Sequence, residues 1–96
     1  MKDEKNPLVK YSDLFNKQRK SLPIEIRIAF IETRDLFLEE PNHPGLRNHA
    51  LKKRFEGYRS IDVTDDYRAI YRKRMEGERE IIYFYMIGTH KELYGK

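Results

Sequence analysis

The 96-residue sequence has no cysteine and no long apolar run. The absence of cysteine excludes disulfides and thiolate metal sites, and it fits a reducing cytosol. No segment approaches the roughly 20 apolar residues that a membrane-spanning helix needs. The polar start of the chain, residues 1–7, does not resemble a secretory signal peptide. We therefore expect a cytoplasmic protein that has no membrane partner.

Several common catalytic signatures are also missing. The three histidines, His43, His49 and His90, contain no close-spaced pair of metal ligands. The sequence has neither a glycine-rich phosphate loop nor a serine in an elbow motif. We therefore expect no metal and no other cofactor. What remains is acid–base chemistry by histidine and carboxylate side chains.

The length predicts a single domain over residues 1–96, in which residues 1–6 form a disordered tail. Residues 8–11 are predicted to form a short strand. Ser12 is a suitable N-cap for a helix over about 13–20, and Pro23 suits the first position of a helix over about 23–40. The apolar residues of this second helix recur at three- and four-residue spacing and predict a core-facing stripe: Ile26, Ala29, Phe30, Thr33 and Phe37, widened by Ile24, Ile28, Ile31 and Leu38.

Three further strands are predicted in the second half of the chain. They cover about 54–63, with Gly57 as a bulge or bend, then 67–74 and 81–87. Thr64, Asp65 and Asp66 are typical turn residues between the first two, and residues 76–78 form the next turn. The predicted fold class is α+β, with two N-terminal helices packed on one face of a mostly antiparallel sheet of three or four strands.

Positive charge is concentrated in the middle of the chain. The net charge is +4, but residues 46–74 alone hold nine Lys or Arg against four Asp or Glu. Such an excess suits a polyanion such as nucleic acid, or an acidic protein partner. A solvated basic surface would have the same composition.

The strand after the predicted turn carries the first candidate site. Asp66 and Arg68 are two residues apart, so on a strand they share one face, where they could bind and act on a phosphate or form a surface ion pair. The start of one antiparallel strand lies beside the end of its neighbour, which predicts that Asp66 lies near His90. His49 could approach from the connection before the sheet.

Two histidines and a carboxylate among arginines suit RNA cleavage without a metal. A base removes the proton of the ribose 2′-OH, which attacks the adjacent phosphate, while an acid protonates the departing 5′ oxygen. Arginine or lysine stabilises the charge on the phosphate. Tyr67 or Tyr94 could stack on a base.

At these residues the sequence resembles the RelE/ParE superfamily of bacterial type II toxins, and within it the YafQ-type mRNA endoribonucleases. Four segments carry the resemblance over nearly the whole chain: HALK at 49–52, GYRS at 57–60, DYRAIY at 66–71 and GTHKELY at 88–94. The closing segment, taken together with the preceding strand, is the most specific of the four.

The resemblance implies a toxin that enters the ribosomal A site of the 70S ribosome, where it contacts ribosomal RNA and cuts translated mRNA. It also implies a cognate antitoxin that wraps and neutralises it, and operator DNA bound only through that antitoxin. Catalytic roles carry over to His49, Asp66 and His90. The expected substrate-binding residues are Arg59, Tyr67, Arg68, Tyr94, Lys52 and Lys53.

The sequence departs from the family pattern at Asp62, where YafQ-type toxins can carry a second histidine. A carboxylate there could act as a base, or could hold a neighbouring histidine or arginine. Positions 67 and 94 are tyrosine, where the pattern has tryptophan and phenylalanine. Two alternative functions share the predicted fold: a ParE-like toxin that inhibits DNA gyrase without cutting RNA, and an inert protein that only binds its antitoxin.

Overall fold

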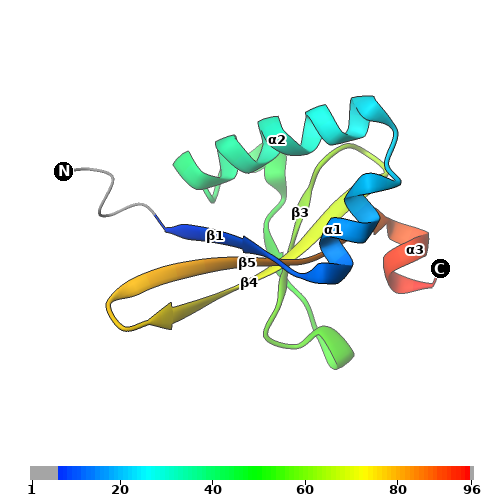
Figure 1. Cartoon of the computed structure of the whole chain (residues 1–96). Coiled ribbons are helices and arrows are strands. Elements are labelled where there is room, and N and C mark those ends of the chain that lie inside the picture. Colours follow the sequence, from blue (N-terminus) through cyan, green and yellow to red (C-terminus); the bar gives the residue numbers. More distant parts are fainter. Residues whose placement is uncertain (1–6, 96) are drawn as a thin grey trace.

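Two helices cover one face of a twisted sheet in the computed structural model, which describes residues 7–95 (Figure 1). The predicted tail at residues 1–6 lies outside the described residues. The elements follow one another as β1 (Leu8–Tyr11), α1 (Asp13–Lys20), α2 (Ile24–Glu39), β2 (His49–Ala50), β3 (Arg59–Asp62), β4 (Tyr67–Glu76), β5 (Arg79–Thr89) and α3 (His90–Tyr94). The predicted α+β class is confirmed.

The N-terminal elements agree closely with the sequence prediction. Strand β1 and helix α1 have the predicted bounds, and α2 is one residue shorter at each end. The hydroxyl of Ser12 accepts a hydrogen bond from the Phe15 amide at 2.9 Å, so Ser12 caps α1 as expected.

The sheet has five strands in the order β1-β5-β4-β3-β2. The strands pair antiparallel except at one edge, where β1 runs parallel to β5. The prediction of three or four strands was too low because β2 has only two residues, too few for a recognisable alternation. This short strand positions one of the candidate site residues, since His49 pairs with Ser60 and is thereby held at the edge of the sheet.

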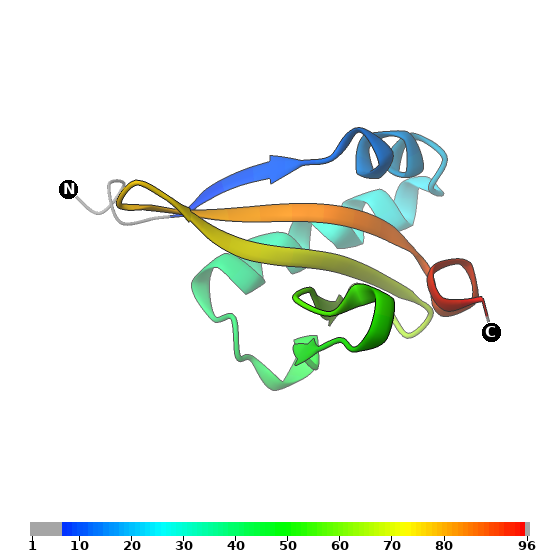
Figure 2. The same cartoon turned by 90° about the horizontal axis from the view of Figure 1, so that it is seen from below.

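Two other sequence predictions need correction. The strand predicted over 54–63 is confined to β3, because Lys53–Phe55 form a 3-10 turn and Gly57 lies outside the strand with φ of 93°. Residues 90–94, for which the sequence analysis predicted no helix or strand, form helix α3. Figure 2 shows the 3-10 turn in front of the sheet, with α2 behind it, and α3 at the end of β5.

The main core lies between the helices and the sheet. The rings of Phe15, Phe30 and Phe84 pack together with centroids 5.1–5.7 Å apart, and all three are fully buried. Three residues of the predicted stripe on α2 are not in this core: Ile24, Ile28 and Ile31 are 60%, 52% and 47% exposed. The assignment of these three to the core was wrong, since they lie on the side of α2 turned away from the sheet.

A smaller apolar cluster forms on the opposite face of the sheet, around Ile70, Phe55 and Leu93. Ile70 is fully buried, so this face of β4 is covered. Phe55 comes from the 3-10 turn and Leu93 from α3, so the cluster anchors both segments to the sheet. Among the described helices, none is long and apolar enough to cross a membrane.

Candidate active site

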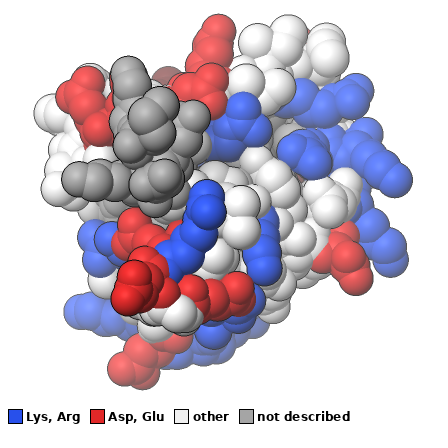
Figure 3. All heavy atoms as spheres, turned by 60° about the vertical axis from the view of Figure 1, so that its left-hand side comes forward, with Lys and Arg blue, Asp and Glu red and all other residues white. Residues whose placement is uncertain are grey.

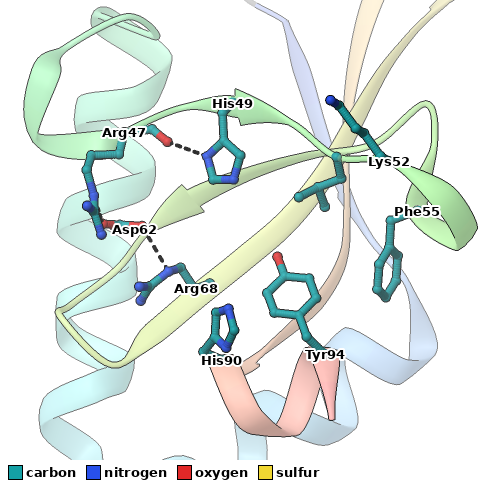
Figure 4. A pocket seen from close by; sticks show the side chains of 9 residues that line it. Arg47, His49, Lys52, Phe55, Asp62, Arg68, His90 and Tyr94 are labelled. Carbon is teal, nitrogen blue, oxygen red and sulfur yellow. Dashed lines mark hydrogen bonds and ion pairs between the residues drawn. The ribbon is translucent and has the colours of Figure 1, made fainter. Parts of the chain in front are cut away.

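A cleft of about 500 Å³ opens beside the smaller apolar cluster, between the β2–β3 edge and helix α3 (Figure 4). The residues around it come from five segments of the chain that the fold brings together. They are Arg47, His49, Leu51, Lys52, Phe55, Asp62, Arg68, His90 and Tyr94. Apolar side chains from the cluster line one part of the cleft, and charged side chains line the rest.

Asp62 is paired with two arginines of the cleft. Its Oδ2 accepts a hydrogen bond from Arg47 Nε at 2.7 Å, and Arg68 Nε lies 3.1 Å from Oδ1 as an ion pair. The hydrogen bond and charge of Asp62 raise the pKa of Arg47 above its ordinary value. A carboxylate at this position could act as a base or hold a neighbouring side chain. The geometry favours the second role, in which Asp62 holds two arginine side chains.

His49 has a defined orientation. Its Nδ1 lies 2.8 Å from the carbonyl oxygen of Arg47. Because a carbonyl oxygen can only accept, the proton of a neutral His49 lies on Nδ1, and Nε2 is free to accept a proton. Figure 4 shows the ring directed into the cleft.

His90 and Tyr94 enter from the opposite side on helix α3. The two rings lie 4.7 Å apart, and in Figure 4 the Tyr94 hydroxyl points into the cleft. Helix α3 starts with a capping box, in which Thr89 Oγ1 accepts from the Glu92 amide at 3.1 Å and Glu92 Oε1 accepts from the Thr89 amide at 2.8 Å. This cap determines where the first residue of the helix, His90, is held.

Asn48 connects the cleft to the main core. Its side-chain amide donates to the Tyr71 hydroxyl at 2.8 Å, and its carbonyl oxygen accepts from Arg59 Nε at 2.8 Å. Burial raises the pKa of Tyr71. Since Asn48 immediately precedes His49, these bonds hold the backbone that presents the histidine.

Four of the predicted site residues do not line this cleft. Asp66 lies close to His90, as predicted, but the contact is a backbone hydrogen bond of 3.2 Å from the His90 amide to the Asp66 carbonyl. The carboxylate of Asp66 is exposed. The carboxylate that pairs with Arg68 is that of Asp62, because Asp66 lies in the turn before β4.

The other three residues lie outside the cleft for different reasons. Arg59 is bound to Asn48, and Tyr67 packs against the main core on the other face of the sheet. Lys53 faces a neighbouring hollow with Arg54 and Gly95.

The sequence prediction missed Arg47, Leu51, Phe55 and Asn48 as parts of the site. Arg47 adopts a left-handed conformation with φ of 46°, which turns the chain into β2. The local signal in the sequence was its position shortly after the loop residues Pro44 and Gly45. Phe55 was expected within a strand, and Asn48 has no recognisable motif.

The cleft combines features suited to a phosphodiester. Arg47, Lys52 and Arg68 contribute positive charge against the single carboxylate of Asp62 among the lining residues. Two imidazoles face each other across this charged part. Among residues 7–95, no group of three or more His, Asp or Glu side chains is placed to hold a metal ion.

Solved structures of bacterial toxins share this fold. YafQ from Escherichia coli BL21(DE3) is 22% identical with a TM-score of 0.75, and the match covers 93% of this chain and 99% of YafQ. A YoeB/ParE toxin from Agrobacterium tumefaciens is 14% identical with a TM-score of 0.71, covering 86% of this chain and 98% of the toxin.

A third match is to the RelBE2 toxin–antitoxin complex from Mycobacterium tuberculosis, at 23% identity and a TM-score of 0.66, over 88% of this chain and 99% of the matched one. Neither a protein-family model nor a curated protein matches the sequence. The resemblance seen in the sequence is therefore confirmed at the level of structure: the chain has the fold of YafQ and the RelE/ParE-type toxins.

Proposed function

We propose that this protein is the toxin of a type II toxin–antitoxin pair and cleaves translated mRNA by a metal-independent, ribosome-dependent reaction. The observation that carries the proposal is the cleft in which His49, His90 and Tyr94 surround the arginines held by Asp62. The toxin fold and the sequence resemblance to YafQ-type nucleases support it.

In the proposed reaction His49 is the general base. Its Nδ1 is bound to a carbonyl oxygen, so Nε2 is the atom that takes the proton of the ribose 2′-OH. The oxygen then attacks the adjacent phosphorus, forming a 2′,3′-cyclic phosphate as the bond to the 5′ oxygen breaks. Arg47 and Arg68 stabilise the charge on the non-bridging phosphate oxygens.

His90 is the proposed general acid, which protonates the departing 5′ oxygen from the other side of the cleft. Tyr94 lies beside it, and its hydroxyl makes no hydrogen bond within the described part of the chain. That hydroxyl is available to donate to a phosphate oxygen, and the ring is available to stack on a base. Asp62 holds the arginines in position. Asp66 supports His90 through the backbone.

A cognate antitoxin is the proposed protein partner, with operator DNA reached only through it. The exposed Ile24, Ile28 and Ile31 on α2 form an apolar strip that an amphipathic segment can cover. The matched Mycobacterium tuberculosis toxin is in complex with an antitoxin.

The antitoxin can be identified as a protein whose co-expression restores the growth of cells that express the toxin. The substitution Ile28→Glu should abolish this rescue and leave the toxicity unchanged.

The test is primer extension on mRNA from cells that briefly express the protein, beside His49→Ala and His90→Ala. We expect in-frame cuts at codon positions that disappear in both variants. Arg27→Gln, on the exposed side of α2, is the matched control and should cut normally. Intact mRNA with arrested growth would instead support gyrase or another binding target. Intact mRNA with normal growth would leave only an antitoxin-binding protein.

A further inference from the structure

A second hollow adjoins the cleft on the same side of the sheet. It measures about 410 Å³ and is lined by Arg54, Phe55, Tyr58, Tyr85 and Met86. Phe55 lines both the cleft and this hollow, so its ring forms a shared wall between them. A ligand that extends out of the cleft past Phe55 therefore enters an aromatic surface.

The aromatic rings of this surface are paired with arginines. Tyr58 and Tyr85 lie with ring centroids 5.1 Å apart, and the Arg72 guanidinium lies 5.5 Å from the Tyr58 ring centre. Arg54 lies 5.1 Å from the ring of Phe55. Both tyrosines are half-buried, so each ring keeps part of its surface available for contact.

The two arginines of this surface form no ion pair with a carboxylate of the described residues. Arg34, Arg47, Arg68 and Arg74 each lie within 4.0 Å of a carboxylate, whereas no such ion pair occurs for Arg54 or Arg72 within residues 7–95. Instead, Arg54 donates to the Leu93 carbonyl at 3.2 Å. A guanidinium held against a ring keeps its positive charge and free N–H groups for an anion.

The opposite end of β4 and β5 contrasts with this surface. There Lys10 and Arg74 both pair with Glu76, and Lys73 pairs with Glu80. In Figure 3, blue and red side chains are correspondingly intermingled below the grey terminal residues. The arginines of the surface next to the cleft therefore differ from the basic residues at this end of the sheet, which are paired with carboxylates.

We propose that the surface formed by Arg54, Phe55, Tyr58, Tyr85 and Arg72 binds single-stranded RNA that continues from the cleft, with bases on the tyrosines and phosphates on the arginines. This inference rests on the proposed function and adds a substrate subsite to it. Base stacking on aromatic rings and backbone contact with cationic groups is how proteins bind single strands without reading sequence. The subsite therefore extends the contact with the RNA without adding base specificity.

The test measures binding of uncleavable 2′-O-methyl RNA, which lacks the attacking hydroxyl. Oligonucleotides of about four and about twelve nucleotides are compared, because a short strand fills the cleft and a longer one reaches the new surface. We expect Tyr58→Leu and Arg72→Gln each to weaken binding of the longer strand at least fivefold and to leave the shorter unchanged. Arg72→Gln should also reduce the slope of log affinity against log salt by about 0.7.

Two matched controls accompany these variants. Tyr58→Phe keeps the ring and should bind both oligonucleotides like the wild type, and Arg27→Gln removes an equal charge from the opposite side of the molecule. Circular dichroism and thermal melting establish that each variant is folded. Equal weakening for both lengths, or no weakening for either, would overturn the subsite.

A third measurement separates the substrate from ribosomal RNA. If Arg72→Gln weakens binding to 70S ribosomes but not to the longer oligonucleotide, the surface contacts the ribosome and the substrate assignment is wrong. Because the oligonucleotides cannot be cut, the result does not depend on catalysis. A protein that binds them as expected but never cuts mRNA would retain this subsite and lose the proposed function.

Discussion

Arg68 Nε lies 3.1 Å from Asp62 Oδ1, across the pairing of β3 and β4, while Arg47 Nε binds the other oxygen of the same carboxylate at 2.7 Å. One carboxylate thus orients two guanidinium groups that come from different parts of the chain. Its side chain is 13% exposed, so the pair with Arg68 is largely shielded from water. We infer that Asp62 positions the phosphate-binding groups and does not itself transfer a proton.

Asp62→Asn tests this role. Without the carboxylate, Arg47 and Arg68 no longer have a competing anion, so we expect uncleavable RNA to bind several-fold more tightly. Cleavage should fall about tenfold because the arginines are no longer oriented. The pH–rate profile should keep its shape, since no proton-transfer group is lost. Disappearance of one limb of that profile would show instead that Asp62 is the base.

Tyr94→Phe separates the two uses of this side chain. The hydroxyl points into the cleft, where it can donate to the negative charge that develops on a phosphate oxygen in the transition state; a hydrogen bond to a charged group contributes about 1.5–3 kcal/mol. We therefore expect cleavage to fall at least tenfold in single-turnover assays, with little change in binding of uncleavable RNA. Wild-type cleavage by Tyr94→Phe, with a loss only in Tyr94→Leu, would assign the role to the ring.

Gly88→Ala tests how helix α3 is held. A Cβ at Gly88 would lie 2.9 Å from Glu92 Oε1, so this oxygen must shift, which weakens its bond to the Thr89 amide in the capping box. We expect a loss of about 1 kcal/mol in the free energy of unfolding, measured by urea denaturation. Cleavage should also fall, because His90 and Tyr94 move with the helix. Glu92→Gln, which can keep both capping bonds, should have little effect on either measurement.

Tyr71 makes stability sensitive to alkaline pH. Burial raises its pKa in the folded protein above the value of about 10 for an exposed tyrosine. Since the folded state disfavours the tyrosinate, the free energy of unfolding falls as the pH rises above about 10 and through the folded-state pKa. Tyr71→Phe should lose about 1 kcal/mol at neutral pH, from the bond to Asn48, and should decline less steeply above pH 10. An unchanged alkaline decline would mean that other groups control it.

Local signals in the sequence were enough for the N-terminal helices and both hairpin turns. Ser12 has the capping chemistry that starts α1, and Gly77 has the positive φ of 65° that the tight turn between β4 and β5 uses. These features depend on residues close together in the chain, so composition and spacing reveal them.

Which charged groups meet depends on contacts between parts of the chain that are distant in sequence. Asp66 is nearer in sequence to Arg68 than Asp62 is, yet strand pairing places Asp62 opposite Arg68 and leaves Asp66 in the turn. Likewise the helical spacing of Ile28 is correct for a core stripe, but which side of α2 faces the sheet depends on packing between distant segments. The amino-acid sequence alone was enough to predict most of the elements, though not β2 or α3, and to identify the chemical groups available. Their grouping into one cleft follows from strand register and packing, which are non-local and leave no signal in adjacent residues.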